Sequence, residues 1–220
     1  MNKPAQTVMV ILLTSLFLLA CSSMYLPSLA TATPQTIVTM PPMPTEFLVQ
    51  PPIETTQTGS GLENENLLAG LPEGFKIGYQ AEQGNQTITE MVAEGETVED
   101  WTTMVTVQVY LGETTITPEQ ARDTLTQSWF DACANSEVYP VADGAENGYN
   151  FVLWQLYCPL NPATQKMEYT YMKAIQGNDS FYLVQVAFRY EPTEDAITQW
   201  IRYLQQVQVC DSRIAERSCP

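Results

Sequence analysis

The fold is decided by the stretch Tyr149–Tyr190, YNFVLWQLYCPLNPATQKMEYTYMKAIQGNDSFYLVQVAFRY. Three runs within it, at 149–158, 167–176 and 180–190, combine apolar and polar residues in the pattern of long strands. The last two runs are separated by Gly177-Asn178-Asp179, residues that favour hairpin turns. The sequence therefore predicts three consecutive strands, of which the last two form a hairpin.

Shorter strand patterns precede this stretch. Residues 75–79 and 87–92 have the alternation of half-buried strands, with a turn at 82–85 between them. In a third run, 101–110, one face carries Trp101, Thr103, Val105, Val107 and Val109. We expect these three strands to form a meander, and a short strand at 138–142 to precede the long ones.

Two helices are predicted from capping signals and apolar spacing. Thr117-Pro118-Glu119-Gln120 combines a capping threonine, a proline suited to the first helical position and a glutamine at the capping-box position. This helix runs to Cys133. The second helix begins at Pro192-Thr193-Glu194-Asp195, where the acidic residues complement the helix dipole. The two apolar stripes consist of Ala121, Leu125, Ser128, Trp129 and Ala132, and of Ile197, Trp200, Ile201, Leu204 and Val207.

These elements predict an α+β domain at residues 73–220, with an antiparallel sheet of about six strands flanked by two helices that bury their stripes on it. The order of strands and helices resembles the PsbP/Mog1 group, which implies an α/β/α sandwich. The segment Glu96–Gln108, ETVEDWTTMVTVQ, is similar to a segment of uncharacterised proteobacterial exported proteins and lipoproteins. That resemblance implies export and no particular activity.

The N-terminus has the pattern of a signal peptide at residues 1–20. Its apolar stretch from Val8 to Ala20 is shorter than the roughly 20 residues that span a bilayer. Leu18-Leu19-Ala20-Cys21 resembles the bacterial lipobox, which implies cleavage before Cys21 and a diacylglycerol thioether on its sulfur. In Gram-negative lipoproteins a serine at the next position, here Ser22, implies transfer to the outer membrane. The alternative is an ordinary secretory signal with a chance cysteine.

Residues 21–72 are predicted to be a disordered tether. Ser22–Ser60 holds 7 of the 15 prolines and 8 threonines without Lys or Arg, a composition that opposes helices and central strands. Such a spacer extends by about 3.1 Å per residue. It is either a passive linker, or its apolar run Glu46-Phe47-Leu48-Val49 docks a partner or folds back on the domain. Residues 61–72 form the transition into folded structure.

Four cysteines remain after Cys21, and an even number in an exported domain predicts two disulfides. Three connectivities are open for four cysteines. We favour Cys133–Cys158, which links the end of the first helix to a strand, and Cys210–Cys219, which closes the C-terminal tail. Free or redox-active thiols are the alternative. Metal binding usually needs a C-x-x-C pair, and the sequence has none.

Charge and composition exclude several function classes. The chain has 9 Lys+Arg against 25 Asp+Glu and no His. Binding to nucleic acid needs clusters of Lys and Arg, so we expect no such partner. The absence of histidine removes the commonest general base and the usual serine and cysteine triads. We therefore name no catalytic, metal-binding or cofactor-binding residue.

Three further patterns have both a functional and a structural interpretation. An acidic series within 82–100 either attracts a cation or a basic partner, or lies in solvated turns. Residues 143–148 superficially suggest a calcium loop, but they lack its alternating ligands and terminal glutamate and so predict a turn. The aromatic residues of 149–190 form either core or an exposed binding surface. The acidic series is Glu82, Glu90, Glu94, Glu96, Glu99 and Asp100.

Together these features predict a lipid-anchored protein of the bacterial envelope, in the outer membrane, whose periplasmic or surface-exposed domain binds an envelope protein without catalysis. One alternative is a hydrolase that acts on envelope material through Asp and Glu, which requires a deep pocket with two carboxylates of perturbed pKa. Another is a purely structural envelope protein. The leading hypothesis, a lipid-anchored binding protein, depends on Cys21 carrying the acyl chains.

Overall fold

The protein is described by a computed structural model over residues 62–220. The predicted signal peptide, Cys21 and residues 22–61 lie outside the described residues. No helix in the described part is long and apolar enough to cross a membrane. The elements are β1 (Glu65–Leu68), β2 (Phe75–Gln83), β3 (Gln86–Ala93), β4 (Thr103–Leu111), α2 (Pro118–Ala132), β5 (Glu137–Glu146), β6 (Tyr149–Asn161), β7 (Lys166–Gln176), β8 (Ser180–Phe188), α3 (Glu194–Gln206), β9 (Gln208–Asp211) and a short 3₁₀ helix, η1 (Ala215–Arg217).

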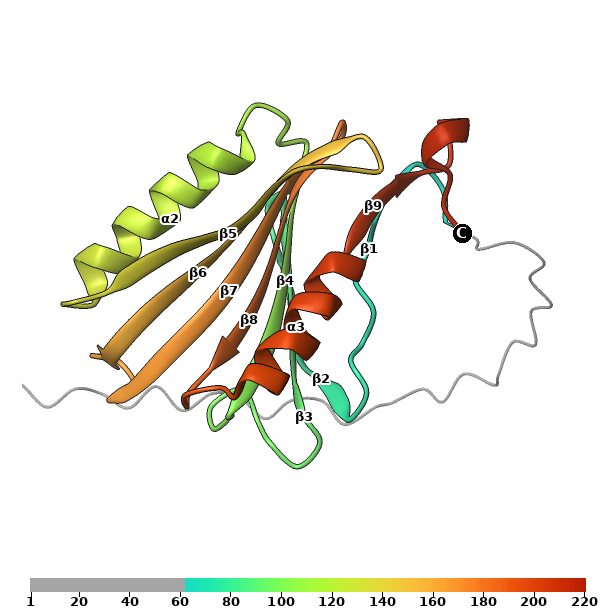
Figure 1. Ribbon diagram of the computed structural model, residues 1–220. Helices are drawn as coiled ribbons and strands as arrows, with labels where there is room; N and C mark the ends of the chain where they lie inside the picture. Colours follow the sequence, from blue (N-terminus) through green and yellow to red (C-terminus); the bar gives the residue numbers. More distant parts are fainter. Residues whose placement is uncertain (1–61) are drawn as a thin grey trace, which may run out of the picture. The chain divides into compact units, whose positions relative to one another are not determined.

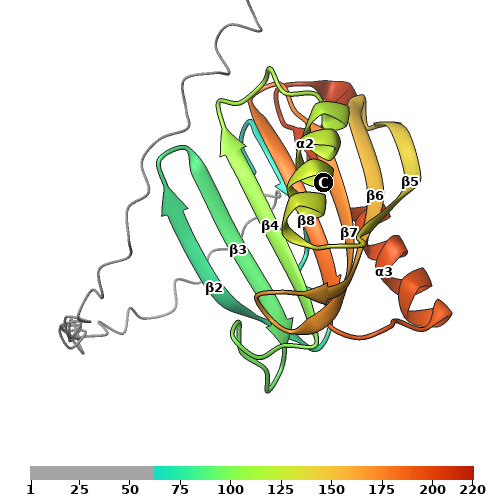
Figure 2. The same ribbon diagram turned by 90° about the vertical axis from the view of Figure 1, so that its left-hand side faces the viewer.

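Seven strands form one antiparallel sheet in the order β2-β3-β4-β8-β7-β6-β5 (Figures 1 and 2). β2, β3 and β4 form the predicted meander, and β5 to β8 form a second one. The two meanders join where β4 pairs with β8, from Thr103 opposite Phe188 to Leu111 opposite Ser180. The predicted hairpin at Gly177-Asn178-Asp179 is confirmed, because it connects β7 to β8.

The prediction of about six strands is wrong, because the sheet has seven. The sequence assigns only residues 138–142 to a short strand and 143–148 to a turn. β5 instead runs over ten residues, and the turn is confined to Asn147-Gly148, both of which have positive φ. β5 is an edge strand that is almost entirely exposed and contains Pro140. An exposed edge strand has no alternation of buried and exposed residues, so its pattern is weak.

The helices pack on opposite faces of the sheet (Figure 1). On the face that we call the α3 face, Trp200 and Leu204 pack against aromatic and β-branched residues of the central strands, including Phe188. On the α2 face, Ala121, Leu125 and Trp129 pack against Trp154 and its neighbours. The predicted α3 stripe therefore packs against the sheet. Of the predicted α2 stripe, Ala121, Leu125 and Trp129 pack on the sheet, whereas Ser128 and Ala132 are exposed.

The helix starts follow the predicted capping chemistry. The Thr117 side chain accepts from the Gln120 backbone N–H, while the Gln120 side chain accepts from the Thr117 N–H, which completes the capping box. Thr193 caps α3 by accepting from the Ala196 N–H at 3.3 Å. Each cap satisfies backbone donors that a helix start leaves free.

Trp101 is the exception to the predicted face pattern. The sequence places it on the same face as Val105, but β4 begins only at Thr103. Trp101 instead packs with Val92 and Ala187, and the Arg189 guanidinium lies 3.9 Å from the centre of its ring. A residue outside the strand does not follow the strand's alternation, so the alternating pattern cannot predict the face on which Trp101 packs.

Disulfides join Cys133 to Cys158 and Cys210 to Cys219, the two pairings that the sequence favours. The first attaches the C-terminal end of α2 to β6, a strand that α2 covers. The second closes the segment after β9 that includes η1.

A second, two-stranded sheet pairs β1 with β9, from Glu65 opposite Asp211 to Leu68 opposite Gln208. β1 lies within residues 21–72, which the sequence predicts to be a disordered tether with a transition into folded structure at 61–72. Its position is held by the Glu65 carboxylate, which accepts from the backbone N–H groups of Asn178 and Asp179 at 2.6 and 3.1 Å. The carboxylate also accepts from the Tyr182 hydroxyl at 2.9 Å.

Candidate functional site

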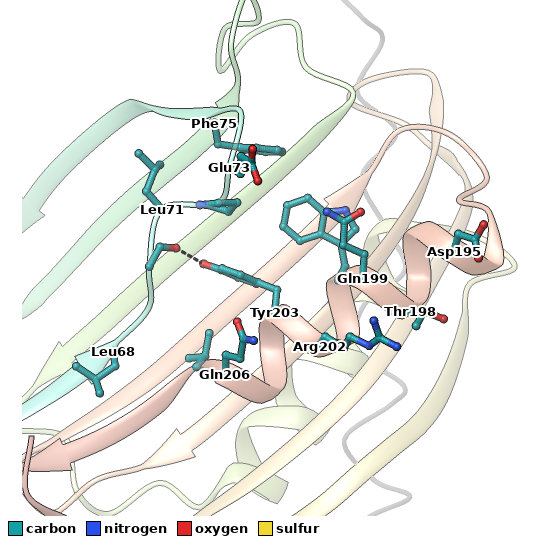
Figure 3. A pocket seen from close by; sticks show the side chains of 14 residues that line it. Leu68, Leu71, Glu73, Phe75, Asp195, Thr198, Gln199, Arg202, Tyr203 and Gln206 are labelled. Atoms are coloured by element: carbon teal, nitrogen blue, oxygen red, sulfur yellow. Dashed lines mark hydrogen bonds between the residues drawn. The ribbon is translucent and has the colours of Figure 1, made fainter. Parts of the chain in front are cut away.

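A hollow lies between α3 and the chain that links β1 to β2 (Figure 3). We call it the α3 groove, and its volume is about 700 Å³, within the usual range for binding sites of roughly 300–1,000 Å³. The linking chain contributes Leu68, Gly70, Leu71, Pro72, Glu73 and Phe75, and the helical side contributes Asp195, Thr198, Gln199, Trp200, Arg202, Tyr203, Gln206 and Val207.

Aromatic side chains form the floor of the α3 groove. The Phe75 and Trp200 rings meet edge to face with centroids 5.3 Å apart, and Tyr203 packs on Trp200 with centroids 5.6 Å apart. The Tyr203 hydroxyl donates to the Gly70 carbonyl oxygen at 2.9 Å, the bond drawn in Figure 3. This bond ties the linking chain to α3, so the two walls of the groove hold each other in place.

The floor of the α3 groove is uncharged at neutral pH, and its rim carries charged side chains. Burial raises the pKa of Tyr203 to about 12, so its hydroxyl stays protonated at neutral pH. The charged groups of the rim, Glu73, Asp195 and Arg202, are exposed. Leu71 is 54% exposed at the edge. An apolar floor with a polar rim is the pattern of a surface that takes an apolar anchor from a partner.

A second hollow, which we call the β1 groove, lies on the α3 face over β2, β3 and β4. Its volume is about 480 Å³. β1 and the residues after it form one wall, through Glu65, Asn66, Leu67, Ala69 and Leu71. The floor and far side are formed by Ile77, Gln80, Thr87, Thr89, Met91, Val107, Val109, Leu111, Ser180 and Tyr182. Leu71 lines both grooves.

Lys173 is a buried charge that contacts the C-terminal end of α3 and lines neither groove. It is 1% exposed, and its Nζ donates to Glu146 and to the carbonyl oxygens of Leu204 and Val207. Burial lowers the pKa of Lys173, and the Glu146 carboxylate opposes that shift. Because it closes the C-terminal end of α3, we interpret Lys173 as a residue that positions the helix.

The acidic series does not form a site. Glu82, Glu94, Glu99 and Asp100 are exposed, and Asp100 pairs with Lys166 at 3.6 Å. Glu96 accepts from the backbone N–H and the hydroxyl of Thr102, which stabilises a loop. Burial raises the pKa of Glu90, but Glu90 lines neither groove. Among residues 62–220, no three His, Cys, Asp or Glu side chains are placed to hold a metal ion.

The aromatic residues of 149–190 are mostly core. Tyr157 and Tyr169 are half-buried with ring centroids 4.5 Å apart, and Tyr190 is 39% exposed. The other seven are buried: Tyr149, Phe151, Trp154, Tyr171, Phe181, Tyr182 and Phe188. The aromatic floor of the α3 groove comes from other segments. The sequence names Trp200 as core only and gives no role to Leu71 or Tyr203, because their proximity depends on a contact between distant segments.

Two solved structures with the Mog1 name are similar to parts of this chain. A mutant of the protein Mog1 has 13% identity, with 60% of this chain and 76% of that chain covered and a TM-score of 0.35. The Ran-binding protein Mog1p of Saccharomyces cerevisiae has 12% identity, with 64% and 85% covered and a TM-score of 0.36. No curated protein matches the chain.

A protein-family model matches residues 73–213, which include both helices and the entire seven-stranded sheet. The match covers more than half of the chain. The chain belongs to the protein family whose model spans residues 73–213.

Proposed function

We propose that the chain is a lipoprotein of the bacterial cell envelope, attached to the outer membrane through acyl chains on Cys21. Its domain binds another envelope protein through the α3 groove and catalyses no reaction. The anchor is supported by the lipobox pattern Leu18-Leu19-Ala20-Cys21 and by the short apolar run before it. Two or three acyl chains on one cysteine give stable membrane attachment, because each buried methylene contributes about 0.8 kcal/mol.

The observation that carries the binding role is the aromatic floor of the α3 groove. Phe75 and Tyr203 pack edge to face on the buried Trp200, next to Leu71, which exposes more than half of its area. Rigid aromatic surfaces offer contact area at a low cost in conformational entropy, which is why they recur at protein interfaces. A partner with an apolar anchor and a basic rim suits this groove, because the chain has a net charge of −16.

The positions of the two helices also support a more specific proposal about the architecture of the domain. With α2 and α3 on opposite faces of the sheet, we infer an α/β/α sandwich of the PsbP/Mog1 kind.

The alternative, an Asp/Glu hydrolase, requires two carboxylates of perturbed pKa in one deep pocket. Three carboxyl groups of residues 62–220 have a shifted pKa: the pKa of Glu90 is raised, and those of Glu113 and Asp211 are lowered. None of the three lines the α3 groove or the β1 groove. These positions favour binding over hydrolysis.

The binding role is tested by capture from detergent-solubilised envelopes with the lipidated protein as bait. Leu71→Asp and Arg202→Glu change the exposed rim of the α3 groove and leave its aromatic floor intact. Phe130→Asp is the matched control, because Phe130 is 41% exposed on α2. We expect one protein that the wild type and Phe130→Asp retain and that the double rim variant loses at least tenfold. Equal recovery by all three baits would contradict a role for this groove.

A further inference from the structure

A polar pocket lies at the end of the sheet where β6 begins and β7 ends, and it shares no lining residue with either groove. We call it the Arg217 pocket. Its volume is about 340 Å³, at the lower end of the roughly 300–1,000 Å³ usual for small-ligand sites. Within residues 62–220 its lining contains no Asp or Glu and no Ala, Val, Leu, Ile or Met. Its side chains belong to Thr114, Tyr149, Asn150, Gln176, Asn178 and Arg217, and two glycines complete it.

Arg217 provides the positive charge of this pocket. It forms no salt bridge within residues 62–220. The nearby carboxylate of Asp211 instead accepts hydrogen bonds from the Arg213 side chain at 2.8 and 2.6 Å, so its charge is already balanced. The Arg217 guanidinium is therefore available for an anion that comes from outside the chain.

Packing holds the Arg217 side chain in position. Its guanidinium lies 4.6 Å from the centre of the Tyr149 ring. A Cβ atom at Gly148 would lie 2.7 Å from the Arg217 Nε, so the guanidinium fits only because residue 148 is glycine. The disulfide between Cys210 and Cys219 closes the segment that carries Arg217. A guanidinium that is already held in place loses less conformational entropy when it binds a ligand.

Tyr149 adds a buried donor to the pocket. It is 2% exposed, and its hydroxyl has no hydrogen-bond partner within the described residues. Burial raises the pKa of Tyr149 and the neighbouring Arg217 opposes that shift, so the hydroxyl stays protonated at neutral pH. A buried polar group without a partner is unfavourable, and an oxygen atom of a ligand beside Arg217 supplies the missing acceptor.

We propose that the Arg217 pocket binds a sugar acid with a single carboxylate. The carboxylate pairs with the Arg217 guanidinium, whose two parallel N–H groups match its two oxygens. The sugar hydroxyls bind the side-chain amides of Asn150 and Asn178, because amides, like hydroxyls, both donate and accept hydrogen bonds. The lining has no aliphatic side chain, so an apolar ligand gains little here.

Charge favours a single carboxylate over a more highly charged anion. The chain has a net charge of −16, and Glu65 and Asp211 both lie close enough to Tyr149 to raise its pKa. A dianionic phosphate meets about twice the repulsion that a carboxylate meets in this field. Arg217 lies beyond the residues 73–213 that the family model matches, so membership of the family does not imply this pocket. Binding here depends neither on lipidation nor on the α3 groove.

The test titrates ¹⁵N-labelled full chain carrying Cys21→Ser with D-glucuronate. The Nε–H resonance of Arg217 and the backbone N–H resonance of Gly148 report on the pocket. We expect both to shift and to saturate, with a dissociation constant on the order of 1 mM for a ligand of this size. D-glucose supplies the hydroxyls without the charge, whereas acetate and inorganic phosphate supply the charge without the hydroxyls. Each of these three should bind at least tenfold more weakly.

Two variants connect the binding to the pocket. Arg217→Met should weaken glucuronate binding at least tenfold, read from the Gly148 resonance, while the matched control Arg122→Met removes the same charge from α2 and should leave it unchanged. Asn150→Asp changes an exposed residue, so it keeps the test open if Arg217→Met does not fold, and its added carboxylate should also weaken binding at least tenfold. The proposal is overturned if glucuronate shifts neither resonance at ten times the expected dissociation constant, or if the two pocket variants bind it like the wild type. Equal binding of acetate or phosphate also overturns it, because the pocket would then be an unselective anion site.

Discussion

The ammonium of Lys173 donates to the carbonyl oxygen of Leu204 at 2.9 Å, so a strand in the centre of the sheet holds the last turn of α3. The same Nζ donates to the Val207 carbonyl oxygen at 2.9 Å and pairs with Glu146. The C-terminal end of a helix has carbonyl groups without hydrogen-bond partners and carries a partial negative charge. A cation placed there donates hydrogen bonds to the carbonyl groups and balances the charge. α3 forms one wall of the α3 groove, so Lys173 helps to hold that wall in position.

The first prediction concerns this ammonium. Lys173→Met should lower the free energy of unfolding by roughly 3–5 kcal/mol, because it leaves Glu146 and two buried carbonyl groups without their partner. Urea unfolding followed by circular dichroism measures the loss. Lys76→Met is the control, since Lys76 is exposed on β2, and it should change stability by less than about 0.5 kcal/mol. Equal effects of the two substitutions would show that the buried contacts of Lys173 do not matter.

The second prediction concerns Glu65, which attaches β1 to the hairpin between β7 and β8. Glu65→Gln should weaken the hydrogen bonds to the N–H groups of Asn178 and Asp179, because an amide oxygen is a poorer acceptor than a carboxylate. Hydrogen exchange at the backbone amides of β1 and β9 should then accelerate, while exchange in β6 and β7 stays slow. Glu63→Gln, an exposed neighbour, provides the comparison. Unchanged exchange in β1 would contradict the role given to Glu65.

The third prediction concerns pH. The hydrogen bond from Arg213 lowers the pKa of Asp211 from 3.8 to about 2. A carboxyl group whose pKa is lower in the folded state contributes stability that is complete above its unfolded pKa and disappears as pH falls through its folded pKa. The stability difference between wild type and Asp211→Asn should therefore be constant above about pH 4 and shrink between pH 4 and pH 2. Urea unfolding across this range measures it. A difference that stays the same down to pH 2 would contradict the role given to the Asp211–Arg213 hydrogen bond.

The fourth prediction compares the disulfides. Cys133 and Cys158 are 25 residues apart, and Cys210 and Cys219 are 9 apart. If each bond stabilises mainly by restricting the unfolded chain, replacing the first pair with alanine costs about 3.5 kcal/mol and replacing the second about 2.6 kcal/mol. Denaturant unfolding of the two double variants checks the order. A larger loss at the C-terminal pair would mean that native packing around Cys210, and not loop length, dominates.

The sequence predicts the elements whose local pattern is strong. The central strands β6, β7 and β8 are long runs rich in aromatic and branched apolar residues. Thr117 and Gln120 carry a complete capping box, and the turn at Gly177-Asn178-Asp179 is explicit. β5 is predicted too short because both of its faces are exposed, so no periodic burial marks its length. β1 and β9 are too short for a periodic signal, and their pairing joins segments at opposite ends of the described chain.

The candidate site is less predictable than the fold. Leu71 lies between β1 and β2, and Tyr203 lies on α3, so they meet only in the folded domain, where β1 pairs with β9 and Tyr203 donates to the Gly70 carbonyl oxygen. Nothing local in either segment indicates this contact. The role of Lys173 is equally hard to predict from the sequence, because its contacts form only when the C-terminal end of α3 packs next to β7.

Lipid attachment at Cys21 is tested most directly by the intact mass of the mature protein recovered from bacterial membranes. We expect a chain that begins at Cys21 and carries the added mass of a diacylglycerol group and an amide-linked acyl chain. Cys21→Ser should abolish that added mass and the incorporation of labelled palmitate. A wild-type chain that begins after the signal, has an unmodified Cys21 and fractionates with the aqueous proteins would contradict the proposed anchor.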